Sequence, residues 1–528
     1  MIIPATKLVD IIQPAIQTII VGGGAVGLTM AVDLARSGRQ VTVLEAGPDT
    51  VSKSSQRHFE SAISVGRILE GLHHGRFRAL GGTTNFWGGQ IVRFDPLVFG
   101  QRSWLGNSVA WPFDRCALDP FYDRALELLG MQKAIDDDIS VMRRVAISPP
   151  PLPEQLEFFF TRWLPEPNLA IRFKNDINSL QNLRIITGAT VVSLTSNKAN
   201  PEQLTGVTVI DERGRRLEFN SDRVVLANGT IEIARLLSVP LSEEREAPWN
   251  RNLWLGRGFI DHLDCDVGDV QLIDKQRFHD LFDNLFIDGI KYTPKLKLAE
   301  SAQIGHELLG ASGHFLFSSE LTERALDAKI FFKSILRGRF KGSWLNLPKH
   351  LASAIAVGLP MLVRYFRSHR VYNYTDGGVR LRVSLEQKQI AESGLILRKE
   401  VDEFGLPLVA LDWRVEGSEI ETLSFFSERV ADYLSKAGIA QMRLNENILR
   451  RDRELLDSAE DTCHHMGMAR MSNDAATGVV DKDLKVYGSA NLFVAGAAVF
   501  PSSGCCNPTF TAIALGLRLS NSIQRGKV

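Results

Sequence analysis

The sequence from residue 18 to residue 46 constrains the fold more than any other part of the chain. It begins with Ile19 to Val21, an apolar β-branched run typical of a parallel strand that is covered on both faces. Three glycines follow at once in the spacing G-x-G-x-x-G: Gly22, Gly24 and Gly27. The first allows a tight turn, the second lets a pyrophosphate approach the backbone, and the third lets a helix lie close to the sheet. The pattern therefore predicts a strand, a phosphate-binding turn and a helix over residues 28 to 36.

A second strand and an acidic residue complete this unit. Gly38 ends the helix, residues 41 to 44 form another apolar strand, and Glu45 follows 18 residues after Gly27 (45 − 27). A carboxylate in this position can accept hydrogen bonds from the adenosine ribose of a dinucleotide. The strand, glycines, helix, strand and acid in register predict a Rossmann-like dinucleotide-binding fold, although the motif alone does not separate FAD from NAD.

Length and composition set wider limits. With 528 residues the chain is too long for one hydrophobic core, which favours two domains that can be interleaved in sequence. The 61 basic residues equal the 61 acidic residues, so no overall charge would attract a nucleic acid. The five cysteines form neither a C-x-x-C pair nor a zinc-binding pattern, which predicts no metal site and a reducing compartment. We therefore expect a cytoplasmic protein.

The ends and apolar runs of the sequence agree with that expectation. The first 17 residues do not resemble a signal peptide. No apolar run reaches the roughly 18 residues that a membrane-spanning helix needs.

One segment, residues 329 to 370, nevertheless suggests contact with a membrane surface. It contains no Asp or Glu and carries nine Lys or Arg residues among many apolar and aromatic ones. Each basic side chain near an anionic membrane contributes about 1 kcal/mol to binding. The segment is therefore a candidate for peripheral membrane association. The alternative is a pair of helices that cover a domain, with their bases paired to acids elsewhere in this neutral chain.

A second glycine-rich stretch, residues 81 to 89, reads GGTTNFWGG. Four glycines, two hydroxyl residues and two aromatic residues in nine positions suit a loop whose backbone lies against a flat ring. The alternative is an ordinary glycine-rich turn.

The residues best suited to chemistry lie near the C-terminus. Residues 462 to 471 read TCHHMGMARM and contain the adjacent pair His464 and His465. Further on, Asn507, Pro508 and Thr509 open an apolar helix, with the proline in the first turn, where a missing N–H costs nothing. The positive end of that helix favours negative charge on a neighbouring group.

Together these motifs resemble the glucose-methanol-choline (GMC) flavoprotein oxidoreductases. Counterparts in that family exist for the loop at 81 to 89, for VVLANGTIE at 224 to 232, for GRGFIDH at 256 to 262 and for the C-terminal block. The resemblance implies an α/β fold in which a Rossmann-like FAD-binding domain is interleaved with an α+β substrate domain built on an antiparallel sheet. It assigns residues 1–105, 180–265 and 455–528 to the FAD-binding domain and residues 106–179 and 266–454 to the substrate-binding domain.

The resemblance also implies how FAD is held. Some family members bond the flavin covalently to a histidine, and Phe86 stands at that position here, so non-covalent FAD is expected. The implied contacts with FAD come from Gly22, Gly24, Gly27, Glu45, Gly81, Gly82, Thr83, Thr84, Asn85, Trp87, Val192, Gly229, Gly496, Ala497, Pro508 and Thr509.

Three further residues take active-site positions by the same resemblance. His464 corresponds to the catalytic histidine, Asn507 to the second active-site residue, and His465 to the neighbour of that histidine, a candidate for substrate binding with a structural role as the favoured alternative. An imidazole suits the removal of an alcohol proton, and the flavin accepts the hydride. His262 is expected to be structural. Met468 and the Cys505-Cys506 pair depart from the family pattern without removing a catalytic group.

The Asn-Pro-Thr sequence is more like the bacterial sugar-oxidising, pyranose-oxidase-like branch of the family. This likeness implies oxidation of a ring hydroxyl of a sugar, glycoside or polyol, with O2 or another electron acceptor. Two alternatives stay open: a lyase that uses FAD without net redox chemistry, and a membrane-surface binding protein that retains FAD as a structural group. An NAD-dependent dehydrogenase is disfavoured because the loop at 81 to 89 and the C-terminal block would have no role in it.

Overall fold

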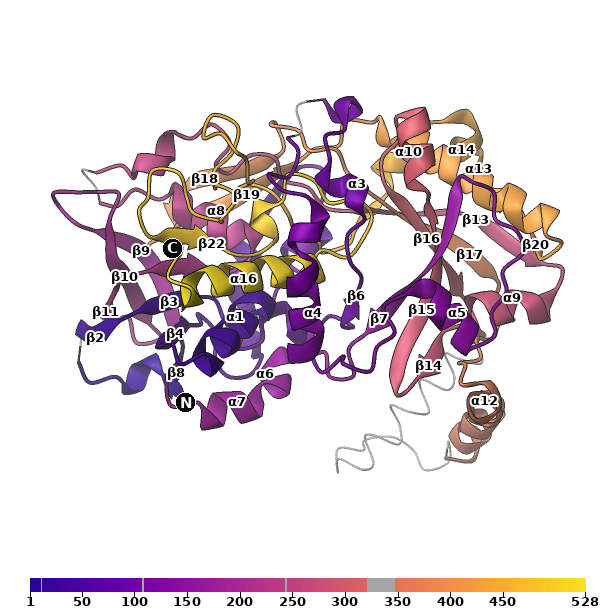
Figure 1. The fold of residues 1–528 in the computed structure, drawn as a ribbon, viewed down its shortest axis with the longest axis horizontal. Coiled ribbons are helices and arrows are strands. Elements are labelled where there is room, and N and C mark those ends of the chain that lie inside the picture. The colour runs from indigo at the N-terminus through magenta and orange to yellow at the C-terminus, as the bar shows by residue number, and fades with distance from the viewer. Residues whose placement is uncertain (11, 107–108, 243–244, 321–346) are drawn as a thin grey trace.

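The structure is a computed structural model that describes residues 1–528 except residues 11, 107–108, 243–244 and 321–346. Two layered units lie side by side, one around a parallel sheet and one around an antiparallel sheet (Figure 1). Buried apolar side chains from both units form one continuous core.

The first unit is built on six parallel strands in the order β1-β8-β4-β3-β12-β22. These are β1 (Ile2–Pro4), β3 (Thr18–Val21), β4 (Val41–Leu44), β8 (Leu183–Thr187), β12 (Val224–Leu226) and β22 (Leu492–Val494). Every residue of β3, β4, β12 and β22 is buried, which explains their continuous apolar sequences. Helices α1 (Ala25–Arg36) and α16 (Thr509–Gln524) lie side by side against the sheet (Figure 1). The predicted Rossmann-like unit is confirmed.

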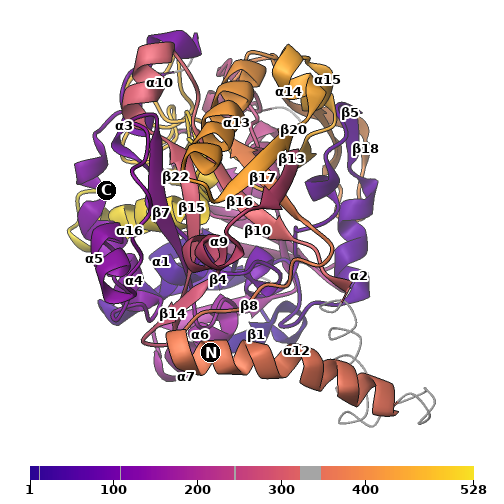
Figure 2. The ribbon, with the colours of Figure 1, turned by 90° about the vertical axis from the view of Figure 1, so that its right-hand side faces the viewer.

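The second unit is built on a large antiparallel sheet. Its main path runs β20-β13-β17-β16-β15-β7-β6, through β20 (Ala440–Leu444), β13 (Leu263–Leu272), β17 (Val379–Leu385), β16 (Ala311–Phe317), β15 (Ile290–Leu298), β7 (Leu156–Trp163) and β6 (Gln90–Ile91). Helix α13 (Glu419–Lys436) covers one face (Figure 2). An antiparallel sheet in the second domain was predicted, and it is confirmed.

Two smaller sheets join parts of the chain that are far apart in sequence. Strand β2 (Ile12–Ile16) pairs with a three-stranded meander of β9 (Ala189–Ser196), β10 (Leu204–Asp211) and β11 (Arg216–Ser221). Strands β18 (Gly394–Val401) and β19 (Pro407–Trp413) pair with β5 (Ile63–Gly66) and not with the large sheet. The predicted domain boundaries thus cut across this small sheet, and also across the large sheet, because β6 lies within residues 1–105 and β13 crosses residue 265; we keep them as a proposal.

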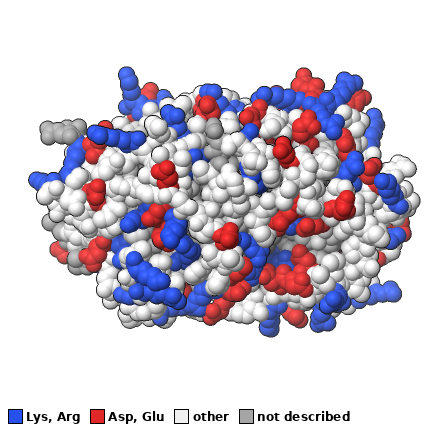
Figure 3. All heavy atoms as spheres, turned by 45° about the horizontal axis from the view of Figure 1, so that its top comes forward, with Lys and Arg blue, Asp and Glu red and all other residues white. Residues whose placement is uncertain are grey.

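Helix α12 (Leu347–Ser368) is the one described element of the basic segment at 329 to 370; residues 329–346 lie outside the described residues. It runs along the lower edge of the molecule (Figure 2). None of the helices in the described residues is long and apolar enough to cross a membrane. On the face drawn in Figure 3, basic and acidic side chains are interspersed, as the zero net charge leads one to expect.

Candidate active site

The glycine turn between β3 and α1 has the geometry that its spacing predicts. Gly22 adopts a φ of +100°, in the left-handed region that side chains disfavour. A Cβ added at Gly27 would lie 2.0 Å from the carbonyl oxygen of Gly22, so the turn and the helix touch here. At Gly24 an added Cβ would meet no atom within 4 Å. The second glycine therefore borders open space, which is where a pyrophosphate would approach the backbone.

A cavity of about 300 Å³ opens above this turn. Among the residues predicted to contact FAD, its lining contains Gly22, Gly24, Glu45, Gly82, Thr83, Gly229, Gly496, Ala497, Pro508 and Thr509. Like Gly24, Gly229 and Gly496 face space in which an added Cβ would meet nothing within 4 Å. Three glycine turns from different parts of the chain thus form an open cradle, which fits a dinucleotide such as FAD.

Glu45 faces both the cavity and the backbone. One of its carboxylate oxygens accepts the N–H of Gly23 at 2.8 Å and the other accepts that of Gly47 at 2.8 Å. Burial raises the pKa of Glu45 to about 7, although these two hydrogen bonds oppose the shift. Each oxygen has a further lone pair with which it can accept a ribose hydroxyl.

The remaining predicted FAD contacts lie behind the cavity lining. Gly27 and Gly81 shape the two turns. Val192 does not line the cavity. Its neighbour on β9, Val191, does, so Val191 stands where the sequence analysis expected Val192. The side chains of Thr84, Asn85 and Trp87 hydrogen-bond to the carbonyls of Gly81, Leu80 and Pro167, so they support the loop.

Two arginines that the sequence reading missed also line the cavity. Arg76 and Arg78 directly precede the loop at 81 to 89. Arg76 donates to Glu232 and Arg78 to the hydroxyl of Thr190. Guanidinium groups bind phosphate strongly, and two bases at the entrance of a glycine-rich loop are the sequence signal that would have identified them.

His464 and Asn507 meet beside this cavity. The two residues come from loops 43 positions apart, and Asn507 Nδ2 lies 3.1 Å from His464 Nε2. On the other side of the ring, His464 Nδ1 lies 2.9 Å from His262 Nδ1 and 2.7 Å from the Thr462 hydroxyl. The predicted catalytic pair is therefore in contact, and His262 contacts the other side of the His464 ring.

The hydrogen-bond chain fixes where the protons lie. His262 Nε2 is 2.9 Å from the carbonyl oxygen of Gly504, which can only accept, so this nitrogen carries the ring proton. His262 Nδ1 then accepts, and His464 Nδ1 must donate to it. The remaining nitrogen, His464 Nε2, is therefore unprotonated, and its lone pair accepts the Nδ2–H of Asn507 at 3.1 Å.

Both histidines are held neutral. Burial lowers the pKa of His262 to about 4. Burial also lowers the pKa of His464 well below its ordinary value, and the positive charges that His262, His465 and Lys295 can carry lower it further. A neutral imidazole with an unprotonated Nε2 is the form that acts as a base.

Asp261 fastens the backbone of the two histidines. Its Oδ1 accepts the N–H of His262 at 2.7 Å, the N–H of His464 at 3.0 Å and the hydroxyl of Thr462 at 2.8 Å. Burial and the nearby Asp461 raise the pKa of Asp261 to about 8. One carboxyl group thus sets the position of both rings.

His465 lines the same cavity. Its Nε2 is buried without a hydrogen-bond partner and lies 3.9 Å from Asp261 Oδ2. Its backbone carbonyl accepts the hydroxyl of Thr230 at 2.6 Å. Because an unpartnered buried nitrogen is costly, it is available to a bound molecule.

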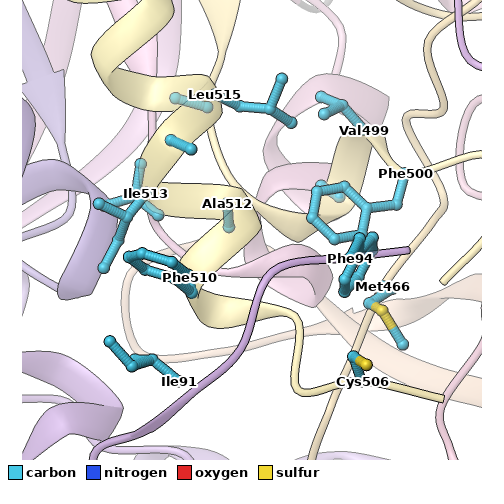
Figure 4. Close-up of a cluster of buried hydrophobic side chains, with 14 of the residues drawn as sticks. Ile91, Phe94, Met466, Val499, Phe500, Cys506, Phe510, Ala512, Ile513 and Leu515 are labelled. Carbon is cyan, nitrogen blue, oxygen red and sulfur yellow. The ribbon is translucent and has the colours of Figure 1, made fainter. Parts of the chain in front are cut away.

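An apolar cluster supports the loops that carry His464 and Asn507. Met466 and Cys506 lie next to Phe94 and Phe500, whose ring centroids are 5.5 Å apart (Figure 4). Met466 follows His464 by two positions, and Cys506 directly precedes Asn507. The unusual Cys506 therefore acts as a small apolar core residue.

A second support is a buried ion pair. Arg102 and Glu386 form two hydrogen bonds of 2.7 Å, and both side chains are 1% exposed. Glu386 also accepts the backbone N–H groups of Gly310 and Gly504. It thus ties the large sheet to the loop that leads to Asn507.

Comparison with known proteins gives two family matches. The family described as "GMC oxidoreductase" matches residues 391–516, and the family described as "FAD dependent oxidoreductase" matches residues 17–248.

Similar proteins exist over nearly the whole chain. The 2-methyl-1,2-propanediol dehydrogenase of Mycolicibacterium austroafricanum is 22% identical over 96% of this chain and 95% of its own. The paromamine 6'-oxidase of Streptomyces fradiae is 23% identical over 96% and 91%. The C-glycoside 3-oxidase of Arthrobacter globiformis is 31% identical over 23% and 22%.

The fold is shared with a solved structure of Aspergillus oryzae formate oxidase. The TM-score is 0.56 at 19% identity, over 97% of this chain and 98% of that one. Taken with the glycine cradle and the His464–Asn507 pair, the match of residues 17–248 to FAD-dependent oxidoreductases and of residues 391–516 to GMC oxidoreductases supports an FAD-dependent oxidoreductase of the GMC type.

Proposed function

We propose that this protein oxidises an alcohol to a carbonyl compound, with His464 as the base. The observation that carries the proposal is the unprotonated Nε2 of His464, held beside the cavity and hydrogen-bonded to Asn507. In the overall reaction the alcohol loses one proton and one hydride.

Each residue has a distinct role in this reaction. His464 Nε2 accepts the hydroxyl proton, because its ring is neutral and its Nδ1–H is fixed by His262. Asn507 Nδ2–H, which points to the same spot, donates to the substrate oxygen and orients it. FAD, held by the glycine turns at Gly22–Gly27, Gly229 and Gly496, supplies the hydride acceptor when it is bound.

The same proposal includes non-covalent FAD. Phe86, at the position of the flavin-linking histidine in some family members, is 66% exposed and stacks on Phe77 with ring centroids 5.5 Å apart. A phenyl ring cannot form the linkage. Flavin should therefore appear in the supernatant after acid precipitation of the protein.

For the substrate we propose a ring hydroxyl of a sugar, glycoside or polyol. Support comes from the named activities of the relatives, which include C-glycoside 3-oxidases and oxidases of aminoglycosides, and from the Asn-Pro-Thr sequence at residues 507–509. The electron acceptor is O2 or another oxidant.

The decisive experiment is the visible spectrum of the purified protein without oxygen, before and after addition of sugars, glycosides and simple alcohols. Bleaching of the flavin by one class identifies that class as substrate. The rate of recolouring in air then separates an oxidase from a dehydrogenase. Bound flavin that no alcohol bleaches would overturn the proposal and favour the lyase alternative.

A second proposal concerns the membrane, and helix α12 supports it. Its side chains Ile355, Leu359, Leu362, Val363 and Phe366 are 55 to 76% exposed. Their spacing places them on one face of the helix. On the opposite side Arg364 pairs with Asp280 and Asp283 at 3.3 and 3.1 Å, so the polar side faces the protein.

This arrangement fits an anionic lipid surface. An apolar stripe turned outward costs free energy in water, and it lies in a segment without acidic residues. Arg364 and Arg370 pair with acidic residues, as expected if α12 is a helix that covers a domain. Arg367, in contrast, is exposed and lies beside the apolar stripe. The remaining basic residues before α12 lie outside the described residues.

Sedimentation with anionic phosphatidylserine vesicles at low salt tests this second proposal. The double variant L362Q/F366Q should bind at least about 10-fold more weakly than the unaltered protein. The control is I304Q on α10 (Glu300–His306), which removes an equally exposed apolar side chain elsewhere. If the unaltered protein stays in solution, there is no membrane contact.

A further inference from the structure

The register of the large sheet gathers polar residues on one face. In the pairing of β15 with β16, Lys297 lies opposite Ser312, which places Lys295 opposite His314. Ser312 lies opposite Ser384 on β17, and Ser384 lies opposite Asp264 on β13. Because side chains alternate along each strand, all of these residues share one face.

This face is turned toward the catalytic loop. The hydroxyl of Ser312 donates to the carbonyl oxygen of Cys505, two residues before Asn507, at 3.4 Å. The other face is covered by α13, where Phe426 lies 2.9 Å from a Cβ added at Gly313. Asp264 is also only two residues beyond His262, the partner of His464. The polar face therefore borders the reaction site.

Burial lowers the pKa of Lys295, and the charge of Asp264 on the same face opposes this shift. Lys295 is 9% exposed, and it forms no hydrogen bond or ion pair with any residue that the structure describes. Its neighbour Lys297, on the same strand face, pairs with Asp95 at 2.5 Å and with Glu157 at 3.2 Å. A buried ammonium group without a partner destabilises a protein, so its presence indicates a function.

Two acceptors beside Lys295 are equally unused. Asp264 Oδ1 and His314 Nδ1 are buried without a hydrogen-bond partner. Burial, and then the charge of Lys295, lower the pKa of His314 to about 3, so its ring is neutral. The site thus holds one donor, the ammonium group of Lys295, and two acceptor atoms, Asp264 Oδ1 and His314 Nδ1, that have no hydrogen-bond partner among the described residues.

We propose that Lys295, His314 and Asp264 bind the non-reacting hydroxyl groups of a polyhydroxylated substrate. This inference rests on the proposed function and deepens it. A hydroxyl group both donates and accepts, so neighbouring hydroxyls satisfy the ammonium group and the two acceptors together. An alcohol without further hydroxyls leaves them unpaired, and such a site discriminates strongly against it.

The test compares methyl glycosides of glucose, galactose and mannose with cyclohexanol, which offers one ring hydroxyl only. The variant is K295M, which keeps the length of the side chain and removes the charge. Binding is followed in the holoenzyme by isothermal titration calorimetry, and flavin reduction without oxygen is followed in parallel. We expect K295M to weaken binding of the preferred glycoside by about 10- to 100-fold. Cyclohexanol should be affected less than about 2-fold.

Two further measurements separate a loss of binding from a loss of folding or an unspecific effect of the substitution. Removal of an unpaired buried charge should raise the Tm of K295M, so weaker glycoside binding cannot be ascribed to unfolding. The control K291M, on the same strand where Lys291 stacks on Trp163, should bind glycosides as the unaltered protein does. Unchanged glycoside binding by K295M, or an equal loss for cyclohexanol, would overturn the inference. Calorimetric binding of a glycoside without flavin reduction would instead contradict the proposed function alone.

Discussion

At the scale of single residues, the unprotonated Nε2 of His464 leads to a direct prediction. The variant H464A should keep FAD, because the glycine turns that hold it are untouched. Flavin reduction by the substrate should slow by at least about 100-fold, because no base remains. Stopped-flow absorbance without oxygen measures this rate. An unchanged rate would remove His464 from the mechanism.

His262 gives a second residue-scale prediction, which concerns positioning. In H262L the Nδ1–H of His464 loses its acceptor, so kcat should fall by about 10- to 100-fold with little change in KM. H262N should recover much of this loss, because its Oδ1 can replace the accepting Nδ1.

The pH dependence gives an independent readout of the same contact. In the unaltered protein the rate should fall as pH drops through the lowered pKa of His464, because protonation removes the lone pair. Since His262 lowers that pKa further, the acid limb of H262L should move to higher pH. An acid limb that stays in place would mean that His262 has a structural role only.

This contact also shows what a sequence can and cannot predict. His464 and Asn507 were predictable because each lies in a short motif. The contact of His262 with His464 was not, because the two residues are 202 positions apart and only the folded chain brings the two rings within 2.9 Å. Sequence reasoning favoured a structural histidine there, and the structure places it against the catalytic ring.

At the scale of elements, two glycines of the turn between β3 and α1 have different roles: Gly24 borders the cofactor cavity, and Gly27 is needed for the fold. G24V should fold but lose FAD, because its side chain enters the open space above the turn. G27V should fail to fold stably, because its Cβ would collide with the carbonyl oxygen of Gly22. Far-ultraviolet circular dichroism and flavin content distinguish the two. Flavin retained in G24V would contradict the assignment of the turn.

The parallel sheet could be predicted because its strands are local apolar runs with glycine turns. Strands β18 and β19 lie within the predicted substrate-binding domain, but they pair with β5 and not with the large sheet. Alternating sequences such as these show that a strand exists, but its partner depends on contacts across more than 300 residues. The cavity-lining Arg76 and Arg78 were missed for a different reason: two bases before a glycine-rich loop are a sequence signal, but bases before a loop are also common among surface residues.

At the scale of the whole molecule, the Arg102–Glu386 pair holds the two units together. R102M leaves a buried carboxylate with only its backbone partners and should lower the free energy of unfolding by about 3 to 5 kcal/mol. The exposed pair Arg450–Glu446 is the control, and R450M should change it by less than about 1 kcal/mol. Urea unfolding measures both. Equal effects would show that burial does not matter here.

The strand order of the parallel sheet has a consequence for protein synthesis. Strand β22 comes from residues 492–494 and pairs with β12, while α16 packs against α1, which begins at residue 25. The first strands of the cofactor domain therefore leave the ribosome well before the segments that complete it, by tens of seconds at about 5 to 20 residues per second. During this interval the apolar surfaces of β12 and α1 lack their final partners. Nascent chains should thus recruit chaperones and should acquire flavin only after release.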